Sequence, residues 1–340
     1  MTEHPIALTM GDPAGIGPDI TLAAWIRRKD ERLPVFFLLG DPDVLTSRAA
    51  LLGLDVPLCI IDEPDEALEA FSDSLPVMPI AVASAVEPGK PDGAAAPAIL
   101  GAIEQAVDLV RGGLASAVVT NPISKAVLTR AGFAHPGHTE YLASLGAEPG
   151  ETLHPVMLLS SDALKVVPVT IHMPLRSVHD VLTTELILRT IRIVHEDFRR
   201  YFGIETPRLA LTGLNPHAGE DGTLGDEEER IILPAIDTAR AEGIHVIGPY
   251  PADTMFHAAA RENYDVALGM YHDQALIPIK TLAFETGVNA TLGLPFVRTS
   301  PDHGTAFPLA GSGKAKPESL IEALRLADAM AKQAAASSAA

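Results

Sequence analysis

Cysteine and tryptophan are almost missing from this chain of 340 residues, which contains one of each. Because Cys59 is the only cysteine, the chain can form no intrachain disulfide and no thiolate zinc cluster, a pattern typical of the reducing cytosol. The first residues, MTEHPIALTM, lack the basic and apolar regions of a signal peptide, and no apolar run approaches the roughly 18 residues of a membrane span. We therefore expect a cytoplasmic protein that has no membrane partner.

Positive charge is also scarce. Lys and Arg total 25 against 44 Asp and Glu, which gives a net charge of −19. This balance argues against sequence-independent binding of nucleic acid or binding of anionic lipid. Any anionic ligand must therefore be bound by a few local cations. Apolar residues make up 47% of the chain and charged residues 20%, so a large buried core is expected, and the length allows two lobes.

Several familiar catalytic motifs are absent. No Gly-x-Ser-x-Gly elbow, P-loop or His-Glu-x-x-His motif occurs, so a serine hydrolase, P-loop kinase or zincin has no support. The segment TMGDPAGIGPDI places Gly11, Gly15 and Gly17 after an apolar run, but their spacing does not match the Gly-x-Gly-x-x-Gly of a dinucleotide fingerprint. A plain strand-to-helix turn explains the segment equally well, with Asp12 opening the turn and Pro18 in the first helical position.

Short apolar runs alternate with helix-periodic segments along the chain. The runs that we expect to be strands are 6–10, 35–39, 58–61, 115–119, 166–171, 208–213, 265–269 and 288–292. Helices are expected over 184–202, capped by Thr183 or Thr184 and ended by Gly203, and from Asp226 through Gly243. Strands that are apolar throughout and alternate with helices predict an α/β fold with a largely parallel sheet.

Three histidines follow predicted strands within four residues. His172, His217 and His272 would lie at one edge of the sheet, where the carboxyl ends of parallel strands meet. A single histidine in such a place is more often a hydrogen-bonded structural residue, but three in matching positions favour a divalent-metal site with open positions for substrate oxygens.

A few polar residues stand in otherwise apolar sequence near the same strand ends. Lys280 follows His272 by eight residues, Arg298 follows Asn289, and the segment GHTE places His138 and Thr139 before a predicted helix. These groups suit a small phosphorylated or carboxylated substrate, although Lys280 and Arg298 could also be ordinary surface charges. Asp253 and Asp273 are candidates for proton transfer or for orienting a histidine ligand.

An ordered series of motifs now carries a resemblance to a known family. The motifs are GDPAGIGPDI, TNPISKAVL, GHTEYLA, IHMPL, LNPHAGEDGTLGDEE, GPYPADTMF and YHDQALIPIKTLAFETGVNATLGLPFVRTSPDHGTAF. They resemble the 4-hydroxythreonine-4-phosphate dehydrogenase family of vitamin B6 (pyridoxine) biosynthesis over about residues 6 to 311. The resemblance implies a two-lobed α/β/α fold similar to isocitrate and isopropylmalate dehydrogenases, with the active site in the interlobe cleft of a homodimer. We expect the first lobe to hold residues 1–130 plus 300–340, and the second, with the metal and substrate residues, 131–299.

The resemblance also implies roles for individual residues. The family's metal ligands fall on His172, His217 and His272, with one ligand from the partner subunit. Its substrate-binding residues fall on His138, Thr139, Lys280, Asn289 and Arg298. Gly11, Asp12, Gly15 and Gly17 belong to a loop near the nicotinamide end of a bound NAD or NADP. Asp221 and Asp226 depart from the family pattern, which usually has glycine and threonine there.

The activity implied by the resemblance is oxidation at C3 of 4-phosphooxy-L-threonine by NAD(P), followed by decarboxylation to 3-amino-2-oxopropyl phosphate. The metal would be Zn²⁺, Co²⁺ or Mg²⁺, and Asp253, Asp273 and Lys280 are the catalytic candidates. Two alternatives stay open. One is a dehydrogenase of the same fold acting on threonate or erythronate 4-phosphate, and the other is a non-catalytic metal- or metabolite-binding protein.

Overall fold

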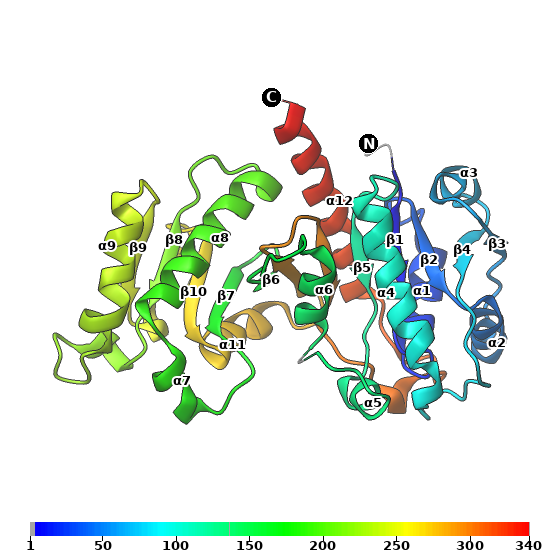
Figure 1. The fold of residues 1–340 in the computed structure, drawn as a ribbon, viewed down its shortest axis with the longest axis horizontal. Coiled ribbons are helices and arrows are strands. Elements are labelled where there is room, and N and C mark those ends of the chain that lie inside the picture. The colour runs from blue at the N-terminus through cyan, green and yellow to red at the C-terminus, as the bar shows by residue number, and fades with distance from the viewer. Residues whose placement is uncertain (1–3, 136, 340) are drawn as a thin grey trace. The chain divides into compact units, whose positions relative to one another are not determined.

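The computed structural model describes residues 4–135 and 137–339 (Figure 1). The chain divides into two compact units: unit 1 runs to Pro155 and resumes over residues 294–336, and unit 2 spans residues 156–293. Residues 138–146, which we expected in the second lobe, belong to unit 1 because Tyr141 and Leu142 pack into its hydrophobic core. The substrate candidates His138 and Thr139 therefore lie in unit 1.

Unit 1 is built on a parallel sheet with the strand order β3-β4-β2-β1-β5-β12. Its strands are β1 (Ile6–Thr9), β2 (Phe36–Gly40), β3 (Leu58–Ile60), β4 (Leu75–Pro79), β5 (Val118–Thr120) and β12 (Arg298–Pro301). Its helices are α1 (Gly17–Ile26), α2 (Pro42–Leu52), α3 (Ala67–Ala70), α4 (Ala96–Arg111), α5 (Lys125–Arg130), α6 (His138–Gly146) and α12 (Glu318–Ala339). Short 3-10 turns are η1 (Pro64–Glu66), η2 (Gly93–Ala95) and η6 (Phe307–Leu309).

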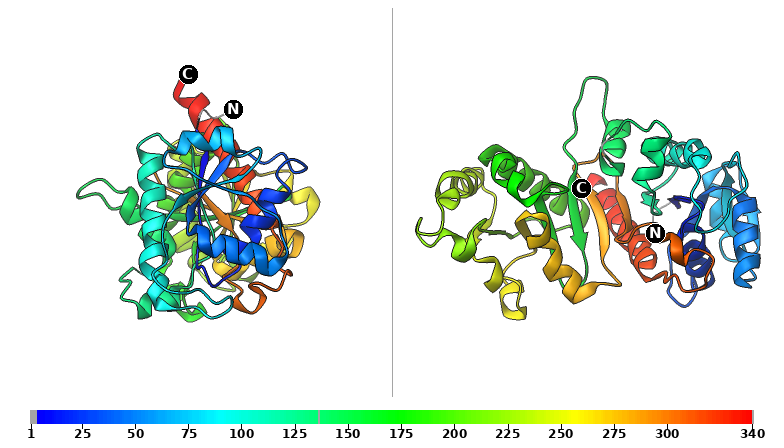
Figure 2. Two further views of the ribbon diagram at one scale, coloured as in Figure 1. Left: turned by 90° about the vertical axis from the view of Figure 1, so that its right-hand side faces the viewer. Right: turned by 90° about the horizontal axis from the view of Figure 1, so that it is seen from below.

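The strands of unit 1 are buried on both faces. Ala7 of β1 joins the core cluster that contains the buried face of α4, whereas Ile6 and Leu8 point to the opposite face and are no more than 1% exposed. Helix α4, cyan in Figure 2 (left), packs on β1, β2 and β5. Double-sided burial explains why these strands are apolar throughout instead of alternating.

One stretch, Gly93–Arg111, is by length and composition long and apolar enough to cross a membrane. Its apolar residues form a stripe that includes Ile99, Ile103 and Val107, spaced four apart, and all three are buried against the sheet. Packing in the core of unit 1 therefore accounts for its apolar character, since the core helix of a globular unit has the same composition.

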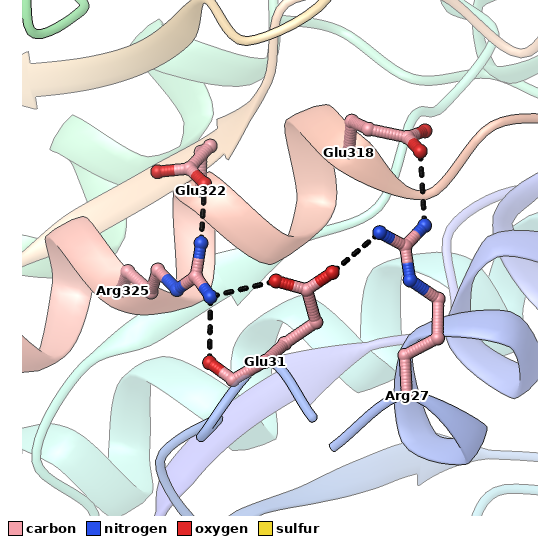
Figure 3. Close-up of polar contacts among 5 residues, drawn as sticks. All are labelled: Arg27, Glu31, Glu318, Glu322 and Arg325. Atoms are coloured by element: carbon pink, nitrogen blue, oxygen red, sulfur yellow. Dashed lines mark hydrogen bonds and ion pairs between the residues drawn. The ribbon is translucent and has the colours of Figure 1, made fainter. Parts of the chain in front are cut away.

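The returning carboxy-terminal segment is fixed to the start of the chain by an ion-pair network (Figure 3). Glu31, which follows α1, accepts from Arg27 at 2.5 Å and from Arg325 of α12 at 2.8 Å. Arg27 also donates to Glu318 at 2.9 Å, and Arg325 donates to Glu322 at 2.6 Å. The network joins residues almost 300 positions apart and so closes the discontinuous unit 1.

Unit 2 has a mixed sheet with the strand order β11-β6-β7-β10-β8-β9. Its strands are β6 (Val156–Ser160), β7 (Lys165–Thr170), β8 (Leu209–Thr212), β9 (Val246–Tyr250), β10 (Val266–Tyr271) and β11 (Val288–Leu292). Its helices are α7 (Leu175–Val181), α8 (Thr184–Phe202), α9 (Leu233–Ala241), α10 (Ala258–Arg261) and α11 (His272–Ala283), with 3-10 turns η3 (Pro216–Gly219) and η5 (Ala252–Thr254) and a π-helical turn η4 (Glu228–Ile232). Strands β7, β10, β8 and β9 are parallel, and β6 is antiparallel to both β7 and β11.

The α/β class and the largely parallel pairing are confirmed, and every run that we predicted to be a strand overlaps one. The helix predicted over 184–202 is also confirmed, with Thr183 capping it and Gly203 ending it in the left-handed conformation. The single helix predicted from Asp226 through Gly243 is wrong in detail. It starts as the π-helical turn η4 and becomes α-helical only at Leu233, because Glu228 is drawn into a buried contact with the preceding loop.

Candidate functional site

The three histidines follow three neighbouring strands of unit 2. Strands β7, β10 and β8 pair in parallel, so their carboxyl ends lie at the same edge of the sheet. His172 comes two residues after β7, His272 directly after β10, and His217 five residues after β8. The sheet therefore brings the loops that carry these imidazoles to one edge.

Two of the imidazoles are close together. The rings of His172 and His272 have their centroids 5.6 Å apart. His217 is exposed, on a turn with φ of 55°. Among residues 4–135 and 137–339, no group of three His, Cys, Asp or Glu side chains is arranged to hold one metal ion. One chain thus brings together two of the three predicted ligands.

Asp273 fixes the tautomer of its neighbour. Oδ1 of Asp273 lies 2.7 Å from Nδ1 of His272. An Nδ1–H that donates to this carboxylate leaves the lone pair of Nε2 available, which is the state that a metal-binding imidazole needs. The other acidic candidate, Asp253, is exposed in η5, which follows β9 and contacts the η3 turn that carries His217.

The strand ends are held in place by three residues that sequence reasoning missed. Thr170 at the end of β7 donates its hydroxyl to the carbonyl of Met270 in β10 at 2.8 Å. Gln274 accepts from the amide of Met270 at 2.7 Å and from the hydroxyl of Thr212 at 2.6 Å, and it donates to the carbonyl of Gly213 at 2.7 Å. A glutamine two residues after His272 was the only signal in the sequence, and its partners are set entirely by the fold.

Lys280 and Asn289 lie away from the histidine edge of unit 2. Helix α11 starts at His272 and runs back along the sheet, so Lys280 lies about 12 Å further along its axis at about 1.5 Å per residue. Asn289 of β11 pairs with Leu159 of β6, and Leu159 pairs with Val166 near the start of β7. Asn289 is therefore nearer the amino end of β7 than the carboxyl end, which His172 follows.

Unit 1 contains a buried cation beside a neutral imidazole. Arg298 on β12 is 3% exposed, donates from Nη2 to the Thr120 hydroxyl at 2.7 Å, and lies with the same nitrogen 3.4 Å from Nδ1 of His138. Burial lowers the pKa of Arg298 to about 10. Burial first, and then the charge of Arg298, holds the pKa of His138 well below its usual value, so the imidazole is neutral.

The arrangement of this pair defines which group can bind a ligand. An imidazole that accepts at Nδ1 carries its proton on Nε2. Nε2 of His138 is buried and has no hydrogen-bond partner within the described chain. It is therefore a donor available to an oxygen of a ligand, next to the positive charge of Arg298. Thr139 lies beside it in the first turn of α6.

The loop that follows β1 is a rigid strand-to-helix turn. Gly11 has φ of 73°, and a Cβ there would lie 2.6 Å from the carbonyl oxygen of Pro122. A Cβ on Gly17 would lie 2.3 Å from the carbonyl oxygen of Met10. The backbone amides of Asp12, Ala14, Gly15 and Ile16 all donate to acceptors in unit 1. These four amides are thus not available to cradle a phosphate, which agrees with the mismatch to the dinucleotide fingerprint.

Arg48 stabilises the same loop through its side chain. Its guanidinium donates to the carbonyls of Gly15 and Pro13, each at 3.0 Å, and forms a buried ion pair with Asp19. Asp19 in turn accepts from the amide of Gly311 at 2.7 Å. Sequence reasoning did not single out Arg48, because nothing local distinguishes it from a surface arginine.

Three buried oxygens near this loop have no hydrogen-bond partner within the described chain. They are Oγ1 of Thr9, Oδ2 of Asp12 and Oδ1 of Asn121. Thr9 ends β1 and Asn121 follows β5, and these strands are parallel neighbours. Burial raises the pKa of Asp12, opposed by a hydrogen bond from the amide of Ala14. A ligand that brings N–H or O–H donors would satisfy these atoms.

An α/β sheet with histidines at neighbouring strand ends, together with a buried arginine–histidine pair, is the architecture of an α/β enzyme that handles a small anion. The chain belongs to the family described as pyridoxal phosphate biosynthetic protein PdxA, whose model matches residues 32–327.

Similar proteins carry consistent names. A 4-hydroxythreonine-4-phosphate dehydrogenase of Methylorubrum populi is 61% identical over 97% of this chain and 95% of its own length. The crystal structure of 4-hydroxythreonine-4-phosphate dehydrogenase from Klebsiella pneumoniae is 38% identical and aligns with a TM-score of 0.84 over 96% of this chain and 99% of that one. A terephthalate 1,2-cis-dihydrodiol dehydrogenase from Burkholderia xenovorans is less similar, at 29% identity and a TM-score of 0.64 over 96% of this chain and 98% of that one.

Proposed function

We propose that the protein is a 4-hydroxythreonine-4-phosphate dehydrogenase of pyridoxal phosphate biosynthesis. It oxidises 4-phosphooxy-L-threonine at C3 with NAD or NADP, and the resulting β-keto acid loses CO2 to give 3-amino-2-oxopropyl phosphate. The observation that carries the proposal is the 61% identity, over nearly the whole of both chains, to a relative of that name. The lower likeness to the diol dehydrogenase favours the phosphorylated substrate.

The anionic substrate group binds to Arg298, His138 and Thr139. Arg298 supplies the charge. Nε2–H of His138, which has no hydrogen-bond partner within the described chain, donates to the same group. Two directional donors to one anion fix its orientation as well as its position, which holds C3 towards the nicotinamide.

His172, His217 and His272 hold a divalent metal, Zn²⁺, Co²⁺ or Mg²⁺. Adjacent rings of His172 and His272 and the tautomer set by Asp273 fit this role. A bound ion supplies Lewis acidity for the C3 oxygen and for the ketone that forms. The chain's own contribution is to place the two rings side by side and to direct the Nε2 lone pair of His272 away from Asp273.

Proton transfer is assigned to Asp273 and Asp253. Hydride leaves C3 for the nicotinamide while the C3 hydroxyl loses a proton, and after CO2 departs the enolate carbon gains one. Asp273 is hydrogen-bonded to His272 and its side chain is 69% exposed, so it can exchange protons with water. Lys280 on the same helix serves the substrate rather than the metal, and Asn289 acts with it.

The nicotinamide nucleotide binds against the loop with Gly11, Asp12, Gly15 and Gly17. The three unpaired buried oxygens there suit the carboxamide N–H or ribose hydroxyl groups of such a cofactor. The glycines allow the close backbone approaches that keep this loop in place.

The active form is a cytoplasmic homodimer with a shared site. Lys280 and Asn289 lie away from the paired histidines of their own chain, so a second copy is needed to unite the set. Helix α11 presents Ile277, 63% exposed, on the same face as Lys280, and Phe284 just after its end is 76% exposed. An apolar face of this kind is suited to the partner subunit.

The test is NADH or NADPH formation by metal-loaded protein from 4-phosphooxy-L-threonine, run beside D-erythronate and D-threonate 4-phosphates. Turnover of the threonine derivative, abolished in His217→Ala, supports the proposal. Turnover only of a sugar-acid phosphate assigns the chain to a different pathway, and no turnover of any of the three identifies a non-catalytic binding protein.

A further inference from the structure

The turn that carries His217 has an unusual backbone. His217, Ala218, Glu220 and Asp221 all have positive φ, between 45° and 55°. Left-handed backbone is unfavourable for residues with side chains and persists only where surrounding contacts impose it. Something in unit 2 must therefore hold this turn.

The contacts that impose it come from Glu228 in η4. Glu228 is 3% exposed, and its Oε1 accepts from the backbone amide of Asn215 at 2.8 Å while its Oε2 accepts from Nδ2 of Asn215 at 3.0 Å. Asn215 precedes His217 by two residues. The carboxylate also lies directly under the turn, because a Cβ on Gly219 would be 2.6 Å from Oε2. Both oxygens of one buried carboxylate thus bind the start of the turn.

The neighbouring Glu227 extends the contact to a second loop. Its Oε2 accepts from Nδ2 of Asn215 at 2.7 Å, and its Oε1 lies 2.9 Å from Nε2 of His179. His179 belongs to α7, the helix that follows His172. Glu227 therefore connects the segment after His172 with the turn of His217.

We propose that Glu228 is a positioning residue that fixes the left-handed turn through Asn215 and so aims His217 at the divalent metal. The inference rests on the proposed function for the identity of the ion. A carboxylate suits this place because both groups that it binds, the backbone amide and Nδ2 of Asn215, are donors. A glutamine in its place would turn an NH2 group towards the N–H groups of Asn215.

The experiment uses the full-length protein, stripped of metal and titrated with Co²⁺, whose visible absorption reports coordination geometry. Glu228→Gln is compared with Glu229→Gln, the exposed adjacent glutamate. We expect Glu228→Gln to weaken Co²⁺ binding by about 10- to 100-fold and to change the absorption spectrum, as loss of an outer partner of a ligand does. Glu229→Gln should match the wild type in both measurements, and Glu228→Asp should restore part of the affinity.

Asn215→Ala provides a second route if Glu228→Gln does not fold. It should weaken Co²⁺ binding to a similar extent, and the double variant should lose no more than either single one. Unchanged Co²⁺ affinity and spectrum in both single variants would overturn the inference. Wild-type protein that binds no Co²⁺ also overturns it, whereas wild-type protein that binds Co²⁺ without oxidising the substrate contradicts only the proposed function.

Discussion

Arg298 and His138 form a buried pair in which the arginine stays charged and the histidine stays neutral. Nη2 of Arg298 lies 3.4 Å from Nδ1 of His138, and burial is the main reason for the lowered pKa of both groups. Taking a guanidinium out of water has a desolvation cost, and a perturbed buried cation beside a neutral donor is typical of a ligand-binding site.

Replacing Arg298 should therefore weaken substrate binding. We expect Arg298→Met to raise KM for 4-phosphooxy-L-threonine at least about 30-fold, the factor that corresponds to ~2 kcal/mol for a truncated buried charge. Steady-state kinetics measures KM, with the exposed Arg189→Met as the control. An unchanged KM would remove Arg298 from the site.

His138 should not titrate near the usual pKa of histidine. Burial, and then the charge of Arg298, holds the pKa of His138 well below its usual value, so the imidazole is neutral at pH 7. Nuclear magnetic resonance of the ring protons, assigned by difference from His138→Gln, tests this. A transition near pH 6.5 would contradict the neutral donor. His138→Gln keeps an N–H donor and should retain more substrate affinity than His138→Ala.

Removing Asp273 should act through His272. Because Asp273 sets the tautomer of that imidazole, Asp273→Asn should weaken Co²⁺ binding by about 10-fold or more. Asp237→Asn, at an exposed position on α9, is the matched control.

Removing the metal should abolish the activity of the wild type. Dialysis against a chelator should stop NADH formation, and added Co²⁺ or Zn²⁺ should restore it. Activity that survives the chelator would exclude the metal from the mechanism.

Asp197 should make the stability of the protein depend on pH. This carboxyl on α8 accepts from the amide of Gly293 at 2.6 Å, and burial raises its pKa to about 6. Because the folded state binds the proton more tightly than the unfolded state, stability falls as pH rises from about 4 to 6. Asp197→Asn keeps an acceptor for Gly293 and should remove up to about 3 kcal/mol of this loss, at about 1.4 kcal/mol per pKa unit.

Urea unfolding at pH 4, 5, 6 and 7 measures this effect. The comparison is Glu196→Gln, which replaces the exposed carboxylate next to Asp197 on the same helix. Parallel stability curves for wild type and Asp197→Asn would show that Asp197 does not titrate in this range.

The exposed apolar face of α11 should be needed for assembly. Ile277→Asp combined with Phe284→Asp should convert a dimer into a monomer and reduce turnover by the same step. Sedimentation equilibrium gives the mass, and Leu51→Asp, which changes an equally exposed apolar residue of α2, should leave it unchanged. A dimer that persists in the double variant would move the interface elsewhere.

Much of the fold could be predicted because its central strands are buried on both faces, which leaves long apolar runs in the sequence. Strands β4, β6, β9 and β12 were not predicted. Three of them contain proline, and β12, with the sequence RTSP, has no apolar residue except that proline. Their strand conformation comes from pairing with neighbours that only the fold supplies.

Some residues of the candidate site could likewise be predicted from the sequence, and others could not. Charged or metal-binding residue types near strand ends, such as His172 and Arg298, can be recognised as site candidates from the sequence. Gln274, Thr170 and Glu228 do not, because their importance lies in hydrogen bonds to residues tens of positions away or to a turn whose left-handed backbone has no simple sequence signature.

The return of the chain into unit 1 affects how the protein folds during its translation. The β5 edge of the sheet lacks its partner β12 until residues 294–336 have left the ribosome. At about 5–20 residues per second, the roughly 180 residues between these strands take roughly 10–40 s to translate. During that interval a growing polypeptide exposes an unpaired apolar strand, so this protein is expected to be a client of ribosome-associated chaperones.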